Sequence, residues 1–88
     1  MKVEFRKSFA KDLGKIRDQD LLDRIKVAIE EIENAENLLD MSNIKKLKAD
    51  GDYYRLRVGN YRIGFIEDEE IISLVRVLHR REMYRYFP

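Results

Sequence analysis

The chain has 88 residues, which fits one domain spanning residues 1–88 and leaves no room for a second hydrophobic core. Hydrophobic residues make up 44% and charged residues 40%, so a folded chain is expected, not a disordered one. The net charge is +1, and the absence of cysteine excludes a disulfide framework and a thiolate metal site. The N-terminal residues resemble a strand more than a signal peptide, and no apolar run reaches membrane-spanning length. We therefore expect a cytoplasmic protein with no membrane partner.

The first half of the chain predicts a short strand followed by two helices. Residues 3–6 form the strand. The first helix can be capped by Ser8, and its apolar positions are Phe9, Leu13 and Ile16. The second can be capped by Asp20, and its apolar stripe consists of Leu22, Ile25, Ile29 and Ile32. Residues 34–52 are expected to be a connection with a short turn, from which Ile44 and Leu47 pack onto the core.

Residues 53–66 predict a β-hairpin, because residues 53–58 and 61–66 alternate apolar and polar around the turn Gly59-Asn60. If Val58 pairs with Tyr61, the core side of the hairpin holds the pairs Leu56–Ile63 and Tyr54–Phe65. The other side then carries Arg57 opposite Arg62, with Arg55 two residues along. Like charges opposite each other destabilise a strand pair, so this arrangement favours a site that binds an anion.

A last strand is predicted over residues 71–78, after an acidic loop at residues 67–70 that we interpret as a solvated turn and not a metal site. Pairing Ile66 with Ile71 would place Ile72, Leu74 and Arg76 with the core. The same alternation would place Ser73, Val75, Val77 and His79 on the arginine side. Residues 79–88 are then a tail that folds beside that side.

These elements predict an α+β domain: a short N-terminal strand, two helices and a three-stranded antiparallel meander. Both helices are expected on one face of the sheet, which leaves the arginine face open. Every lysine lies at or before Lys48, and the rest of the chain carries seven arginines. Arginine binds phosphate with two parallel hydrogen bonds, which lysine cannot do.

The predicted open face suits cleavage of a phosphodiester. Arginines there can hold the phosphate and stabilise the charge of the transition state. His79 can transfer protons near neutral pH, and Tyr84 or Tyr86 can hydrogen-bond a 2′-hydroxyl or stack on a base. Without a metal cluster, the natural reaction is attack by a 2′-hydroxyl on its own phosphate, which restricts the substrate to RNA.

Two segments resemble the RelE/ParE superfamily of toxin–antitoxin toxins: the hairpin Tyr54-Arg-Leu-Arg-Val-Gly-Asn-Tyr-Arg62 and the terminal His79-Arg-Arg followed by tyrosine. The order of the predicted elements also resembles that family, over nearly the whole chain. RelE-type members are metal-independent endoribonucleases that cut mRNA in the ribosomal A site and are neutralised by a cognate antitoxin. The resemblance therefore implies a toxin of a type II system that inhibits translation without a cofactor or metal.

The resemblance also implies the site residues. The catalytic residues would be Arg57, Arg62, Arg81 and Tyr84, with Tyr86 as the second choice of tyrosine and Arg80 as the second choice of terminal arginine. His79 is added as a catalytic residue because of its predicted position on the arginine face, and it is a departure from RelE proper. The RNA-binding residues would be Arg55, Arg80, Arg85, Lys46 and Lys48. The identity of the general base stays open, because Arg55 and Arg57 stand where RelE has lysines and arginine stays charged in proteins.

The implied partners are a RelB-like antitoxin, mRNA in the ribosomal A site and ribosomal RNA, with operator DNA reached only through the antitoxin. Leu38, Leu39 and Met41 either line an apolar groove for the antitoxin or cap the core. Two other functions stay open. The chain could be a ParE-like inhibitor of DNA gyrase, or a catalytically degenerate antitoxin-binding corepressor.

Overall fold

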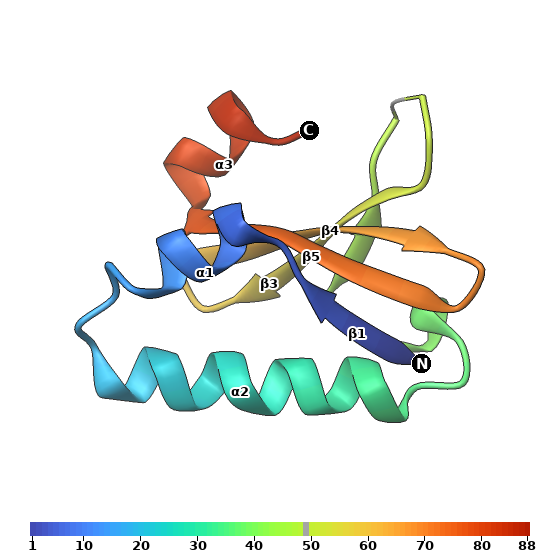
Figure 1. Ribbon diagram of the computed structural model, residues 1–88, viewed down its shortest axis with the longest axis horizontal. Helices are drawn as coiled ribbons and strands as arrows, with labels where there is room; N and C mark the ends of the chain where they lie inside the picture. Colours follow the sequence, from blue (N-terminus) through green and yellow to red (C-terminus); the bar gives the residue numbers. More distant parts are fainter. Residues whose placement is uncertain (49) are drawn as a thin grey trace.

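The computed structural model describes residues 1–48 and 50–88, which form one five-stranded mixed sheet with helices on both sides (Figure 1). The strand order is β1-β5-β4-β3-β2; β1 pairs parallel with β5, and all other pairs are antiparallel. The elements are β1 Lys2–Phe5, α1 Lys7–Leu13, α2 Gln19–Asn34, the 3-10 helix η1 Leu38–Asp40, β2 Ile44–Lys46, β3 Tyr53–Val58, β4 Tyr61–Asp68, β5 Ile71–His79 and α3 Arg80–Tyr86. The predicted α+β class is confirmed, and the sheet is larger than predicted.

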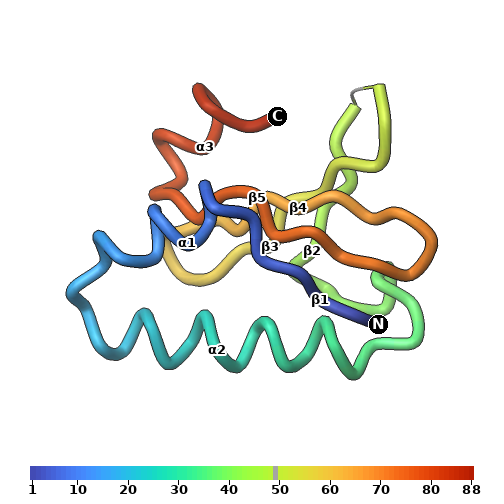
Figure 2. Tube along the Cα trace, in the orientation of Figure 1, coloured from blue at the N-terminus to red at the C-terminus, as the bar shows by residue number. Residues whose placement is uncertain are grey.

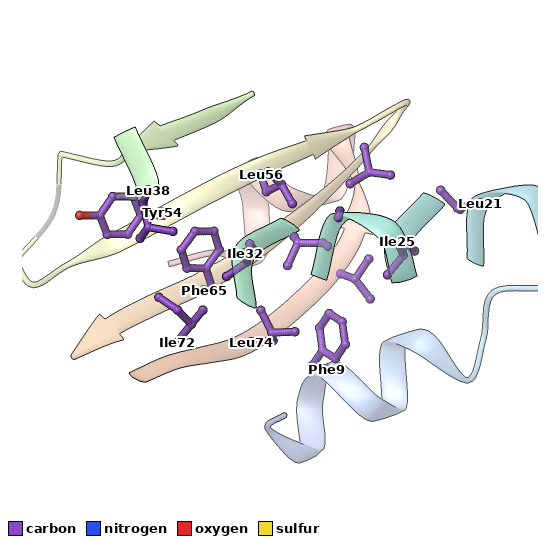
Figure 3. Close-up of a cluster of buried hydrophobic side chains, with 14 residues drawn as sticks. Phe9, Leu21, Ile25, Ile32, Leu38, Tyr54, Leu56, Phe65, Ile72 and Leu74 are labelled. Carbon is purple, nitrogen blue, oxygen red and sulfur yellow. The ribbon is translucent and has the colours of Figure 1, made fainter. Parts of the chain in front are cut away.

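Helix α2 lies along one side of the sheet and encloses the main core (Figures 1 and 3). Its buried residues are Leu21, Ile25, Ala28 and Ile32, so the buried face is rotated slightly from the predicted stripe. The helix also begins earlier than predicted, because the side chain of Asp18, not Asp20, caps it and accepts a hydrogen bond from the Leu21 N–H at 3.2 Å. Ser8 does not cap α1; its hydroxyl donates to the Val75 carbonyl.

The β3–β4 hairpin has the predicted register. Val58 pairs with Tyr61, and Arg57 pairs with Arg62. Gly59 occupies the turn with φ +59°, a left-handed conformation that glycine adopts without steric cost. The alternating pattern and the turn chemistry therefore fixed the geometry of this part of the sheet.

The β4–β5 hairpin differs from the prediction in two ways. Glu69 and Glu70 form the turn, both with positive φ, so Ile71 pairs with Asp68 and not with Ile66. This shift of two residues keeps each side chain on its predicted face. A β-bulge then inserts an extra residue opposite Gly64 and Phe65, which reverses the alternation in the rest of β5. Val77, predicted for the arginine face, is consequently buried in the main core.

Two elements were not predicted. Strand β2 was expected to be an irregular connection, but it pairs with β3 at the edge of the sheet (Figure 2). Helix α3 was expected to be a tail; it lies on the side of the sheet opposite α2 (Figure 1). Met83 and Phe87 pack there against Leu78. Gly64 permits this packing, since a Cβ atom at that position would lie 2.7 Å from the Phe87 ring.

The helices are therefore not confined to one face, and the arginine face is open only beside α3. Among the described residues, no helix combines the length and apolar composition that crossing a bilayer requires.

Candidate functional site

A cavity of about 280 Å³ opens on the side of the sheet that carries the predicted arginines. Strands β2, β3 and β4, the segment before β2 and helix α3 all contribute to it. Its lining residues are Ser42, Asn43, Ile44, Lys45, Arg55, Arg57, Arg62 and Tyr84. The structure thus brings together three predicted arginines, here called the arginine cluster (Arg55, Arg57 and Arg62), and one predicted tyrosine.

Arg62 is the most constrained member of the arginine cluster. Its Nη1 donates hydrogen bonds to the carbonyl oxygens of Gly59 at 3.0 Å and Tyr61 at 2.9 Å. Burial lowers the pKa of Arg62, and the neighbouring positive charges of Arg57 and Arg80 lower it further. A bound anion would offset both the lost hydration and the repulsion between these charges.

No carboxylate neutralises the arginine cluster within residues 1–48 and 50–88. The ion pairs of this part of the chain are Lys2–Glu4, Lys46–Asp52 and Arg76–Asp12. Asn43 makes two hydrogen bonds to the backbone of Arg57: its carbonyl oxygen accepts from the Arg57 N–H at 2.9 Å, and its side-chain amide donates to the Arg57 carbonyl oxygen at 3.1 Å. The cluster is therefore an unneutralised group of cations on paired strands, and such cations can bind phosphate through charge-assisted hydrogen bonds.

Tyr84 reaches the cavity from α3 and is 66% exposed. The Arg55 guanidinium lies over its ring, 4.6 Å from the ring centroid, which is a favourable cation–π distance. Tyr86 lies elsewhere, with its ring 5.9 Å from the guanidinium carbon of Arg76. Of the two candidate tyrosines, the structure places Tyr84 beside the arginine cluster.

His79 does not lie on the arginine face, so that prediction is wrong. It pairs with Tyr61, and the two rings meet edge to face at 5.6 Å. Its Nδ1 accepts a hydrogen bond from the Arg81 N–H at 3.2 Å and caps α3. It lines a second cavity together with Asp12, Lys15, Ile16, Tyr61, Arg76, Val77, Leu78 and Glu82. The β-bulge explains the error, because it reverses the alternation of β5 before His79 is reached.

The predicted lysines also lie outside the cavity. Lys46 pairs with the buried Tyr54 and forms an ion pair with Asp52 at 3.2 Å, a hydrogen bond that raises the pKa of Lys46. Lys48 is exposed in the segment after β2. Lys45, which was not predicted, pairs with Arg55 and lines the cavity. The sequence does contain a signal for the position of Lys45, which is the expected burial of Ile44. In an extended chain the residue after a buried one points to the opposite face of the sheet.

The three terminal arginines lie on α3 and do not line the cavity. Arg80 donates its N–H to the Asn60 carbonyl at 2.8 Å, and its charge is near enough to lower the pKa of Arg62. Arg81 and Arg85 are exposed, and the latter lies 6.0 Å from the ring of Tyr86. No group of three or more histidine, aspartate or glutamate residues in the described ranges is arranged to hold a metal ion.

An apolar groove of about 300 Å³ lies among β1, α1 and α2. Its lining residues are Phe5, Leu13, Leu22, Ile25, Lys26, Ile29, Glu30 and Glu33. The residues predicted for such a groove lie elsewhere: Leu38 is buried in the main core, Met41 packs against it, and Leu39 is 71% exposed.

Comparison with known proteins agrees with these features. Residues 3–84 match the family described as the ParE toxin of the type II toxin–antitoxin system parDE. The chain is 48% identical to Toxin RelE3 of Methanocaldococcus jannaschii, over the full length of both proteins.

Two solved complexes contain similar chains. One is the RelB–RelE antitoxin–toxin complex of Methanococcus jannaschii, with a TM-score of 0.79, 45% identity and coverage of 96% of this chain and 98% of that one. The other, the archaeal RelE–RelB complex of Pyrococcus horikoshii, has a TM-score of 0.74 and 22% identity, covers 90% and 93% of the two chains, and shows the shared fold. The protein belongs to the RelE/ParE superfamily of type II toxin–antitoxin toxins and is RelE-like.

Proposed function

We propose that this RelE-like toxin is an endoribonuclease that cleaves ribosome-bound mRNA and so inhibits translation. One observation carries the proposal: Arg57 and Arg62 face each other across the hairpin with no carboxylate partner among the described residues, and Tyr84 lines the same cavity. Cations held this close repel each other and are retained where a phosphate separates them.

In the proposed reaction, the RNA 2′-oxygen bonds to the adjacent phosphorus while the bond from phosphorus to the 5′-oxygen breaks. The 2′-hydroxyl loses a proton and the 5′-oxygen gains one, which yields a 2′,3′-cyclic phosphate and a 5′-hydroxyl. Arg57 and Arg62 stabilise the charge on the pentacoordinate phosphorus. Tyr84 carries an ionisable hydroxyl at the cavity, and we assign it a role in proton transfer. The nucleophile belongs to the substrate, so the scheme needs no metal-activated water.

In this scheme His79 is a positioning residue and not the proton-transferring residue that the sequence predicted. It caps the helix that carries Tyr84, so it positions the tyrosine and does not touch the substrate. Arg81 and Arg85 are exposed outside the cavity, where they can contact the phosphates of ribosomal RNA.

The test uses ribosomes programmed with two mRNAs that differ by one oxygen atom. The first is unmodified, and the second has a 2′-deoxynucleotide at the position cleaved in the first. We expect the first to be cut to fragments ending in a 2′,3′-cyclic phosphate and the second to stay intact at that position. Cleavage of both would contradict the 2′-hydroxyl mechanism. Cleavage of neither would contradict the nuclease and leave the degenerate corepressor and the gyrase inhibitor as the remaining functions.

A second candidate is inhibition of DNA gyrase, because the matching family model is that of the ParE toxin. A supercoiling assay with purified gyrase separates the two functions. Only a gyrase inhibitor would reduce supercoiling while leaving ribosome-bound mRNA intact.

We further propose that a RelB-like antitoxin binds the toxin and places apolar residues in the groove among β1, α1 and α2. In the two archaeal complexes, RelE is paired with RelB. In the groove, Phe5 is 63% exposed and Ile29 packs only partly against the core. Phe5→Asp should weaken binding of the co-expressed antitoxin without changing cleavage. Unchanged antitoxin binding would place the partner on another surface.

A further inference from the structure

Lys45 extends the arginine cluster onto a third strand. In the register of the sheet, Lys45 pairs with Arg55, and Arg57 pairs with Arg62. Paired residues lie about 5 Å apart, and successive side chains on one face of a strand lie about 7 Å apart. The four residues therefore form two rows of two cations, all lining the same cavity.

The charge of this arrangement exceeds what one phosphate can balance. A phosphodiester carries one negative charge, whereas the two rows carry four positive charges. None of the four forms an ion pair with a carboxylate in the part of the chain that the structure describes. The spacing of about 7 Å between the rows is on the order of the distance between successive phosphates of a single strand.

Arg55 can bind a phosphate while it contacts Tyr84. Its guanidinium lies over the tyrosine ring, and such stacking uses the flat face of the group. The N–H groups point outward in the plane of the guanidinium and stay available to an anion. Lys45 is exposed beside it at the rim of the cavity.

We propose that Lys45 and Arg55 bind a second RNA phosphate, next to the scissile phosphate held by Arg57 and Arg62. The site then takes two consecutive phosphates of one strand, and Lys45 fixes the register of the substrate in the cavity. This inference rests on the proposed ribonuclease function, from which it takes the substrate and the assignment of the scissile phosphate.

Lys46 is a matched control for Lys45, because it is the next residue and carries the same charge. It belongs to the opposite side of β2, where it is paired with Asp52. Lys45→Ala and Lys46→Ala therefore remove equal charge from the protein and differ in whether the lost charge lies at the cavity.

The first measurement is the affinity of the protein for a short single-stranded RNA that contains one 2′-deoxynucleotide at the cleaved position. Fluorescence anisotropy measures this affinity over a range of salt concentrations. Each phosphate contact contributes about 0.7 to the slope of log affinity against log salt for single strands. Lys45→Ala should reduce the slope by about this amount. Lys46→Ala should leave it unchanged, and Lys45→Arg should retain it.

The second measurement locates the phosphate that Lys45 binds. In two further oligomers, an uncharged methylphosphonate replaces the phosphate on the 5′ or the 3′ side of the scissile one. One replacement should weaken binding to the wild type and to Lys46→Ala by about threefold, as expected for an exposed ion pair. The same replacement should weaken binding to Lys45→Ala by a smaller factor, because only the Arg55 charge still faces that phosphate.

Equal sensitivity of Lys45→Ala and wild type to both replacements would overturn the inference. Cleavage of unmodified mRNA is measured separately, so a protein that binds the oligomers and cuts nothing would contradict the nuclease alone.

Discussion

Two arginines of neighbouring strands, Arg76 of β5 and Arg62 of β4, are held in opposite ways. Arg76 donates two hydrogen bonds to Asp12, from Nε at 2.6 Å and from Nη2 at 3.1 Å, and these bonds raise the pKa of Arg76. Arg62 donates to two backbone carbonyl oxygens and has no carboxylate partner in residues 1–48 and 50–88, and burial lowers its pKa. Arginine is therefore neutralised by a carboxylate at Arg76, where it supports the fold, and is not neutralised at Arg62, where it lines the cavity.

Asp12, the partner of Arg76, is buried beside the β-bulge. Asp12 is 6% exposed, and its Oδ2 also accepts a hydrogen bond from the Val77 N–H at 3.2 Å. One carboxylate thereby satisfies both the guanidinium and a backbone donor beside the bulge. This pair belongs to the fold, whereas the arginine cluster is available to a ligand.

The largest effect should follow from removing the unneutralised arginine. We expect Arg62→Ala to reduce single-turnover cleavage of ribosome-bound mRNA by about 10³-fold, as for loss of a group that stabilises transition-state charge. The thermal unfolding temperature should hardly change, because no buried carboxylate loses its partner. Arg17→Ala, which removes an exposed arginine held only by a 3.4 Å bond to Gly14, is the control and should cleave normally. A rate for Arg62→Ala close to that of Arg17→Ala would remove Arg62 from the mechanism.

The neutralised arginine should show the reverse behaviour. Asp12→Ala leaves Arg76 and the Val77 N–H without their acceptor, and we expect it to lower the free energy of unfolding by about 3 kcal/mol. Denaturant titration measures this loss. Glu4→Ala breaks an exposed ion pair of 4.0 Å with Lys2 and should cost less than about 0.5 kcal/mol. Equal stability of Asp12→Ala and Glu4→Ala would show that the buried ion pair of Asp12 contributes nothing to the free energy of unfolding. Asp12→Asn is a milder change for the same comparison.

The two tyrosines of α3 extend the comparison between the arginines. The Tyr84 ring contacts the arginine cluster, and the Tyr86 ring lies near Arg76. Tyr84→Phe should slow cleavage by about 10²-fold, the lower range for loss of a proton-transferring group. Tyr86→Phe should cleave at the wild-type rate, because its hydroxyl lies outside the cavity. Similar rates for both variants would exclude the tyrosine hydroxyl from the reaction.

The arginine cluster could be predicted from the sequence because two local signals agree there. The alternation of residues 53–66 defines the faces of the hairpin, and the turn at Gly59 fixes which residues are opposite each other. Together they place Arg57 opposite Arg62 before any tertiary contact is known.

The remaining parts of the site depend on tertiary contacts. Strand β2 has three residues, too few for a periodic pattern, so Lys45 was not assigned to the cavity. The apolar run of β5 fits either alternation, and the bulge that decides between them arises from pairing with β4. Helix α3 has seven residues and is held by Met83 and Phe87, an apolar pair that also suits an irregular tail.

The smallest expected effect on stability follows from breaking the hydrogen bond between Tyr54 and Glu67. In this pair the partner of the carboxylate is a neutral tyrosine and not an arginine. The buried Tyr54 hydroxyl donates to Glu67 Oε1 at 3.2 Å, and burial, followed by the charge of Glu67, raises the pKa of Tyr54. A tyrosine with a raised pKa stabilises the fold below its unfolded-state pKa of about 10 and loses this contribution as pH rises through the folded-state pKa. Tyr54→Phe should therefore cost about 1 kcal/mol at pH 7 and flatten the decline of the unfolding free energy above pH 10. Urea titrations at neutral and alkaline pH measure both changes. A variant that declines as steeply as the wild type would show that this pair, unlike Asp12 and Arg76, does not couple protonation to folding.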